Sequence, residues 1–146
     1  MAHGNRTGDQ IGGVFEACTA PVACIAKSSQ PVGKVVSAAA SCSMGLELVQ
    51  VFKPDPAIVG RMVPAYISSA LRKTEGSMHS NSLGNEMLLF VAGNMNISRA
   101  MKLCGAEAGR GRFMVFATSG RLLKRFMEMS GSEAVKSLEV SMKPGN

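Results

Sequence analysis

Few residues of this chain have the chemistry for acid–base or nucleophilic catalysis. It contains two histidines, His3 and His79, and two aspartates, Asp9 and Asp55. His3 lies in a polar N-terminal stretch, so His79 is the one candidate general base, and a Ser/His/Asp or Cys/His arrangement would have to be built around it. No motif supports such an arrangement, and we expect His79 to be a surface residue of a polar loop.

Glu86 is the one acidic residue inside an apolar segment. It is either a site carboxylate or a structural one that faces solvent or accepts hydrogen bonds from the backbone, and we favour the structural role. No cluster of His, Cys and Asp residues has the spacing of metal ligands. The sequence therefore predicts a protein without catalytic residues, metal site or cofactor.

A glycine-rich stretch at residues 105–112 has the composition of a phosphate-binding loop. Such a loop needs Gly-Lys-Ser/Thr at the start of a helix, because backbone N–H groups and the lysine must converge on the phosphate. This stretch has no lysine and precedes an expected strand. It is expected to be a turn whose arginines can contact a phosphate from outside.

The whole chain has a net charge of +6 at pH 7, and the positive charge is concentrated in its C-terminal part. Residues 1–96 hold seven Lys/Arg and six Asp/Glu, whereas residues 97–146 hold nine and four. A basic C-terminal half favours binding to an acidic partner, of which nucleic acid is the first candidate. The alternative is that these basic residues lie on helix faces that are simply exposed to solvent. The basic residues that two short helices and the loop between them could gather on one side are Arg99, Lys102, Arg110, Arg112, Arg121, Lys124 and Arg125.

Hydrophobic periodicity and capping residues predict the elements that position these side chains. Residues 82–92 fit a helix or a buried strand, of which we favour the helix, and residues 132–140 fit a last strand or a fraying helix. The other expected strands are 21–27, 46–52 and 113–117, and the other expected helices are 31–43, 56–74, 96–104 and 119–129. This order predicts one compact α/β (α+β) domain over residues 21–146, with helices packed on the faces of a small sheet, after a loosely ordered segment 1–20.

Local signals place several helix ends and one interruption. Asp55 before Pro56 is a strong helix start, and Ser82 and Ser119 are expected N-caps. Gly105 is expected to end its helix in the left-handed conformation. Because a proline inside a helix removes a backbone donor and clashes with the preceding turn, Pro64 should kink or split the helix 56–74. The residues of the helix 96–104 expected to face inward are Ile97, Ala100, Met101 and Cys104.

Cysteine usage and the lengths of the apolar runs bear on the cellular compartment. The four cysteines have irregular spacing without a Cys-x-x-Cys pair, which suits a reducing compartment, and Cys42 and Cys104 fit small buried apolar positions. No apolar run approaches the ~20 residues that a membrane span needs. The polar N-terminus lacks the apolar centre of a signal peptide. We expect a cytoplasmic protein.

Residues 82–105 combine a polar start, an apolar run with an embedded glutamate, a Gly/Asn turn, a short amphipathic helix and a closing glycine. This order resembles the small kinase-binding subunit of the KEOPS (EKC) complex, which makes threonylcarbamoyladenosine in tRNA. The family pattern is Ser-Leu-x-x-Glu, an apolar run, Gly/Ser, a polar turn, Asn/Gln-Ile-x-x-Ala and a closing Gly. The matching positions are Ser82, Leu83, Glu86, Gly93, Asn96, Ile97, Ala100 and Gly105.

The resemblance implies a non-catalytic subunit that is cytoplasmic, and also nuclear in a eukaryote. Members of this family dock on the small lobe of a kinase-like ATPase through a largely apolar helical surface, and archaeal members also help hold tRNA, including its single-stranded 3′ end. By this analogy the kinase-docking residues are Ile58, Met62, Tyr66, Ile67 and Ala70, for which plain core is the alternative. The tRNA-contacting residues are Arg72, Lys73, Arg99, Lys102, Arg110 and Arg112.

Two other functions are compatible with the sequence. A free-standing RNA-binding α/β module would use the same basic face without a kinase partner. With no Trp and one Tyr, the chain offers few stacking platforms, so phosphate contacts would dominate. A small hydrolase or transferase would have to be centred on His79 or Glu86.

Overall fold

A four-stranded antiparallel sheet organises the chain, which the computed structural model describes over residues 20–107 and 111–140. The strands lie in the order β2-β3-β1-β4, and each neighbouring pair is antiparallel. Side chains alternate between the two faces, as in β3, where Met114 and Phe116 face one core cluster and Phe113 and Val115 the other. The strands are β1 (Val22–Ser28), β2 (Val49–Phe52), β3 (Arg112–Ala117) and β4 (Ser132–Leu138).

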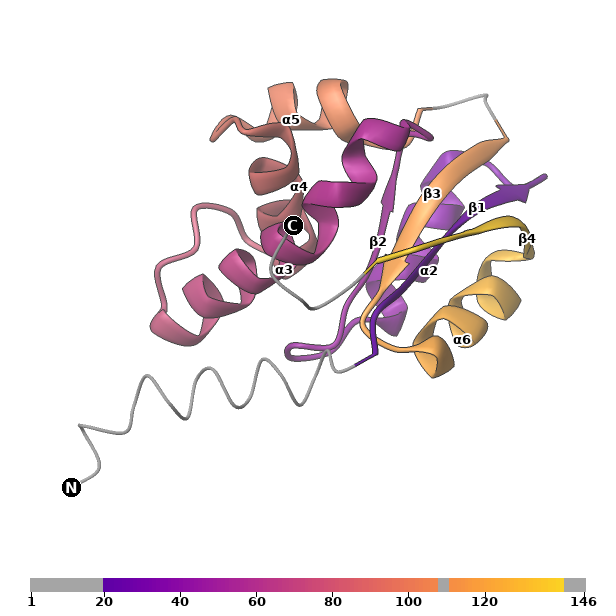
Figure 1. Cartoon of the computed structure of the whole chain (residues 1–146), viewed down its shortest axis with the longest axis horizontal. Helices are drawn as coiled ribbons and strands as arrows, with labels where there is room; N and C mark the ends of the chain where they lie inside the picture. Colours follow the sequence, from indigo (N-terminus) through magenta and orange to yellow (C-terminus); the bar gives the residue numbers. More distant parts are fainter. Residues whose placement is uncertain (1–19, 108–110, 141–146) are drawn as a thin grey trace.

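Helices cover both faces of the sheet and make three layers (Figure 1). The first face packs against α3 (Pro56–Glu75), α4 (Leu83–Ala92) and α5 (Ile97–Cys104). The second face packs against α2 (Val32–Cys42) and α6 (Gly120–Ser130). The prediction of a single compact α+β domain with helices on the faces of a small sheet is confirmed.

Side-chain caps begin the helices where the sequence predicts them. Asp55 accepts a hydrogen bond from the backbone N–H of Ala57, and the hydroxyl groups of Ser82 and Ser119 accept from the third residue after them. Residues 82–92 are therefore a helix, α4, with Ser82 as its N-cap, rather than a buried strand.

Gly105 does not adopt the left-handed conformation expected of it, because its φ is −71°. Its N–H donates to the carbonyl oxygen of Met101 at 2.8 Å, which continues the helical hydrogen bonding. A Cβ atom at Gly105 would lie 2.6 Å from that same oxygen. Glycine is needed at this position for close packing, whereas Gly93 and Gly131 end their helices with positive φ.

Pro64 does not split α3, which runs without a break from Pro56 to Glu75. Pro64 and Gly60 both lie on the exposed side of the helix. The carbonyl oxygen of Gly60 would normally accept a hydrogen bond from the N–H of residue 64, which proline lacks. Because water can bond to a carbonyl on the solvent side, the missing N–H is tolerated there.

The C-terminal segment is a strand, which settles the choice left open by the sequence. β4 pairs with β1 along its length and forms one edge of the sheet, with a register shift between Ile25 and Ala26. Cys42 and Cys104 are buried as expected, and burial raises the pKa of both thiols. Among the described residues, no helix is both long and apolar enough to cross a membrane.

Candidate nucleic-acid interface

Basic side chains collect at one end of the first sheet face, beyond the cover of α3, α4 and α5. Along β1 on this face, Ala23 is buried, Ile25 half-buried and Lys27 exposed. Residues directly opposite each other in an antiparallel pair share a face. Lys27 is opposite Arg112 on β3 and Glu133 on β4, and Ile25 is opposite Lys136. We call Lys27, Arg112, Glu133 and Lys136 the sheet-end cluster.

The charges of the sheet-end cluster are not balanced. The Nζ atom of Lys27 lies 3.8 Å from a carboxylate oxygen of Glu133, with both side chains more than half exposed. Such an exposed pair contributes little to stability. Within the described residues, no carboxylate lies within 4.0 Å of Arg112 or Lys136. Because like charges directly opposite each other on neighbouring strands repel, the Lys27–Arg112 pair gains from an anionic ligand.

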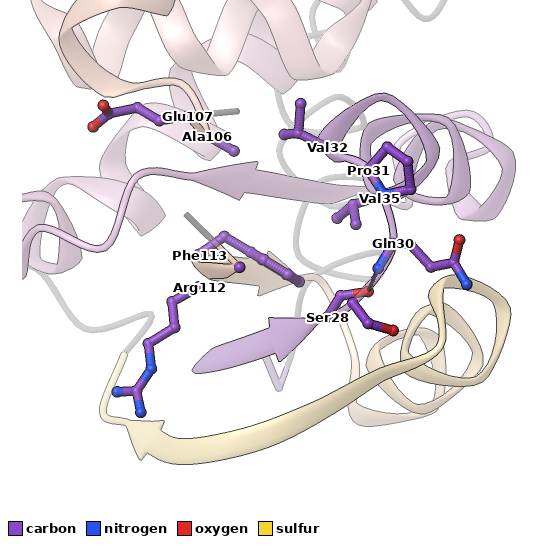
Figure 2. Close-up of a pocket in the computed structure, with 11 residues that line it drawn as sticks. Ser28, Gln30, Pro31, Val32, Val35, Ala106, Glu107, Arg112 and Phe113 are labelled. Carbon is purple, nitrogen blue, oxygen red and sulfur yellow. Dashed lines mark hydrogen bonds between the residues drawn. The ribbon is translucent and has the colours of Figure 1, made fainter. Parts of the chain in front are cut away.

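Two hollows adjoin the cluster. One, of about 410 Å³, is lined by Lys27, Arg112, Glu133 and the backbone turns beside them. The second, of about 320 Å³, lies between the start of α2 and β3, with apolar walls that include Val35 and Phe113 (Figure 2). Figure 2 also shows that the guanidinium group of Arg112 points away from Val35 and toward β4. Arg112 lines both hollows, so its positive charge lies between the apolar hollow and the sheet end.

Arg99 and Lys102 lie on α5, at the same end of the sheet. The backbone N–H of Lys53, directly after β2, donates to the carbonyl oxygen of Cys104 at 2.8 Å, so the end of α5 adjoins the end of β2. Phe52, the last residue of β2, is opposite Met114, two residues after Arg112 on β3. Arg99 and Lys102 are exposed. Arg110, the other predicted contact in this region, lies outside the described residues.

Arg72 and Lys73 do not join this group. The Nζ atom of Lys73 donates to the carbonyl oxygen of Gly45 at 2.9 Å, before the start of β2 and so at the other end of the strand. The guanidinium group of Arg72 lies 3.6 Å from Glu86 and over the ring of Phe90. The structure thus divides the predicted nucleic-acid contacts between two ends of the molecule, and Arg72 already has an anionic partner.

Glu86 is a buried structural carboxylate. It accepts hydrogen bonds from the backbone N–H groups of His79 and Ser80, at 3.0 and 2.9 Å, and from the hydroxyl group of Ser80 at 2.8 Å. Burial acts to raise the pKa of Glu86, but these hydrogen bonds outweigh it and the pKa is lowered. The carboxylate is therefore ionised and fully occupied, as the structural role predicted from the sequence requires, and His79 is exposed beside it.

The predicted docking residues of α3 are mostly core, which corrects the expected surface. Ile58, Met62, Tyr66 and Ala70 are at most 2% exposed, and the hydroxyl group of Tyr66 donates to the carbonyl oxygen of Leu46. Ile67 is half-buried. The apolar face of α3 is wide because it packs against the sheet and α4 together. Those four side chains cannot reach a partner on the surface.

Exposed apolar side chains lie instead on and beside α5. Met95, Met101 and Leu103 are each about half exposed (48%, 51% and 48%). The expectation that Met101 faces inward is wrong, because this short helix buries only a narrow stripe with Ala100 and Cys104. Sequence reasoning also missed Lys27 and Lys136 as members of a basic group, since each is an isolated lysine within its own strand.

Comparisons with known proteins give no family for this chain. No protein-family model matches it, and no curated protein matches its sequence significantly. Within residues 20–107 and 111–140, no three His, Cys, Asp or Glu side chains are grouped so that they could hold a metal ion. The described surface thus carries an unbalanced basic cluster at the sheet end and exposed apolar side chains at α5.

Proposed function

We propose that the chain is a non-catalytic accessory subunit of a KEOPS/EKC complex, which docks on the kinase-like ATPase and helps bind tRNA for threonylcarbamoyladenosine (A37) modification. The observation that carries this proposal is the order of residues in 82–105, where every matched polar or glycine position also has a local role in the α4–α5 unit. Ser82 and Asn96 cap the two helices, and Gly93 ends the first with positive φ.

The docking surface in this proposal is the exposed face of α5 and the turn before it. Met101 and Leu103 offer apolar area of the kind that a protein partner covers. Arg99 and Lys102 on the same helix favour an acidic rim on that partner. This surface replaces the buried residues of α3.

The tRNA surface in this proposal is the sheet-end cluster together with the basic residues of α5. Three cations of the cluster face one carboxylate, and the two hollows beside them can accept a phosphate and its sugar. Phosphate contacts of this kind release counterions, so they weaken as salt rises.

Co-purification of the tagged protein from its own cells, with washes at high salt and identification of partners by mass, tests the proposal. Recovery of a small atypical kinase with a metal-dependent threonylcarbamoyl transferase is the expected result. High salt removes RNA held by phosphate contacts but spares an apolar protein interface.

The second candidate is a free-standing RNA-binding module, favoured by the unbalanced charge of the sheet-end cluster, which needs no protein partner. It predicts recovery of RNA alone, and only with low-salt washes. That outcome would reduce the resemblance at residues 82–105 to a likeness of fold.

A further inference from the structure

β2 forms one edge of the sheet, on the side opposite β4. β2 is the first strand in the order β2-β3-β1-β4, so no strand within residues 20–107 and 111–140 pairs with its far side. The N–H of Thr118 donates to the carbonyl oxygen of Leu48 at 3.0 Å, so the backbone of Leu48 bonds toward β3. Because hydrogen-bonded positions alternate along an antiparallel strand, Gln50 and Phe52 also bond to β3. Val49, Val51 and Lys53 therefore turn their backbone groups to the open edge.

Two of these three outward N–H groups are capped from within the chain. The N–H of Val49 donates to the hydroxyl oxygen of Ser43 at 3.0 Å, and the N–H of Lys53 donates to the carbonyl oxygen of Cys104 at 2.8 Å. The N–H of Val51, between them, has no partner among the described residues, although Val51 is only 2% exposed. An unpaired backbone donor at so buried a residue is rare and calls for an acceptor.

A groove of about 390 Å³ lies over this unpaired group. One wall is formed by Val36, Ala39 and Ala40 of α2, and the other by Leu83, Gly84 and Leu88 of α4 with Met101 of α5. The side-chain amide of Gln50 donates to the carbonyl oxygen of Val51 at 3.3 Å, so it stands where a neighbouring strand would place a peptide group. The groove thus has apolar walls and a strand edge as its floor.

We propose that this groove binds a short extended peptide segment of another protein, which displaces the Gln50 amide and forms one antiparallel bridge to Val51. The peptide residue opposite Val51 exchanges both backbone hydrogen bonds with it. Its side chain points to the α2 wall, as that of Val51 does, and the side chains on either side of it point to α4 and α5. Ser43 and Cys104 accept the hydrogen bonds of Val49 and Lys53, so the strand edge is unavailable on either side of Val51. The groove therefore has room for about three residues of the peptide.

Charge complementarity indicates an acidic residue in this peptide. Lys73 and Glu47 are the charged residues that line the groove. The carboxylate of Glu47 forms an ion pair with the guanidinium group of Arg121, with N and O 3.9 Å apart. Lys73 instead donates to a backbone carbonyl and has no carboxylate within 4.0 Å among the described residues. The charge left unbalanced in the groove is positive, so the peptide carries Asp or Glu at the Gly45 end. The groove shares Met101 with the proposed kinase-docking surface, but the inference rests on Val51 and Lys73 and not on kinase or tRNA contacts.

Selection of random nine-residue peptides on phage against the full chain tests the proposal. The enriched peptides should share an alternating apolar pattern with an acidic residue at one end. Binding of a synthetic copy should slow hydrogen exchange at the Val51 amide, because that N–H gains its missing acceptor. Ala40→Arg, at an exposed position on the groove wall, should weaken binding by about tenfold or more, equivalent to about 1.4 kcal/mol.

Matched variants separate the groove from the rest of α2 and from folding. Ser37→Arg, also exposed on α2 but outside the groove, should bind as the wild type does. Lys73→Glu should fold and should shift the selected peptides from acidic to basic. Lys34→Glu should also fold but should leave the selected peptides acidic.

Three results would overturn the proposal. One is binding that Ala40→Arg and Ser37→Arg leave equally strong, and another is unchanged exchange at the Val51 amide in the peptide complex. The third is a concentration-dependent dimer in sedimentation that Ala40→Arg abolishes, because the occupant would then be a second copy of the chain.

Discussion

At the scale of single residues, Glu86 ties the 76–82 connection to α4. Its carboxylate binds two backbone N–H groups and one hydroxyl group from His79 and Ser80, and Arg72 lies 3.6 Å away. All of these groups are donors, so the site requires the ionised form. A neutral side chain in this position leaves donors unpaired in a buried setting.

Glu86→Gln should lower the free energy of unfolding by about 3 kcal/mol at pH 7, since it removes the charged partner of a buried network. Urea denaturation measures this, with Glu128→Gln on the exposed face of α6 as the control. A loss no larger than that of the control would contradict the structural role of Glu86.

The pH dependence of stability follows from the same carboxylate. The pKa of Glu86 in the folded state is lowered from its ordinary value, so its contribution is present above the unfolded-state pKa of about 4.3 and is lost as pH falls through the folded-state pKa. The wild type should therefore lose stability in acid more steeply than Glu86→Gln. Parallel slopes for the two proteins below pH 4.3, from urea curves at successive pH values, would count against this assignment.

Two glycines with opposite surroundings give a paired prediction. Gly105→Ala should destabilise the protein, because the new Cβ would lie 2.6 Å from the Met101 carbonyl oxygen. Gly60→Ala, inside α3 with open space around it, should stabilise by up to about 1 kcal/mol. Thermal unfolding of the two variants should move in opposite directions, and a gain for both would mean that Gly105 is not packed as described.

At the scale of elements, strand pairing assembles the sheet-end cluster, and helix packing leaves one side of α5 exposed. β1 and β3 bring Lys27 opposite Arg112, although the two residues are far apart in sequence. The short helix α5 buries Ala100 and Cys104 and leaves Met101 and Leu103 outside. Lys27 and Arg112 belong to the first surface alone, and Met101 and Leu103 to the second alone, so these four side chains test the two surfaces separately.

Lys27→Ala and Arg112→Ala should each weaken tRNA binding and reduce the slope of log K against log salt by about 0.7 to 0.9. Fluorescence anisotropy with labelled tRNA over a salt series measures both quantities. Lys124→Ala, on the exposed side of α6, is the control and should change the slope little. A control effect equal to that of Arg112→Ala would indicate diffuse attraction rather than a site.

Met101→Asp and Leu103→Asp should abolish capture of a kinase partner while leaving the melting temperature within a few degrees of the wild type. Met62→Asp should instead unfold the protein, because Met62 is fully buried. Pull-down and thermal melts distinguish these effects, with Met129→Asp on α6 as the surface control. Capture that survives both α5 substitutions would place the docking surface elsewhere.

At the scale of the whole molecule, the sheet separates two cores of different composition. The face under α3, α4 and α5 holds large side chains such as Phe52 and Phe116, whereas the face under α2 and α6 holds many small ones, including Ala38 and Ala39. β1 and β3 are central and covered on both faces, and β4 is an edge strand with mostly exposed side chains.

Hydrogen exchange should follow this arrangement. Amide protons of β3 and β1 should exchange slowest, near the limit set by global unfolding, and those of β4 should exchange by local opening. Mass-resolved or NMR-detected exchange measures the difference. Protection of β4 equal to that of β3 would show that the edge strand opens only with the whole domain.

The sequence by itself determined the elements and many of their ends. Asp55, Ser82 and Ser119 identified helix starts, because capping acts over a few neighbouring positions. Short apolar runs predicted the strands at 21–27 and 113–117, and alternation predicted the strand at 46–52, whereas the type of residues 132–140 was left open. The structural role of Glu86 was also predicted, but the sequence left open whether its carboxylate faces solvent or accepts hydrogen bonds from the backbone. These signals were sufficient for the fold class.

Only the tertiary structure decided which surfaces these elements present. The wide apolar face of α3 fits a docking surface or a core equally well, and packing against the sheet and α4 makes it core. Likewise, Lys27 and Arg112 become neighbours, and Arg72 and Lys73 are separated from them, through strand pairings and helix directions that join distant parts of the chain. Periodicity records how apolar a face is, but burial depends on which distant element covers it.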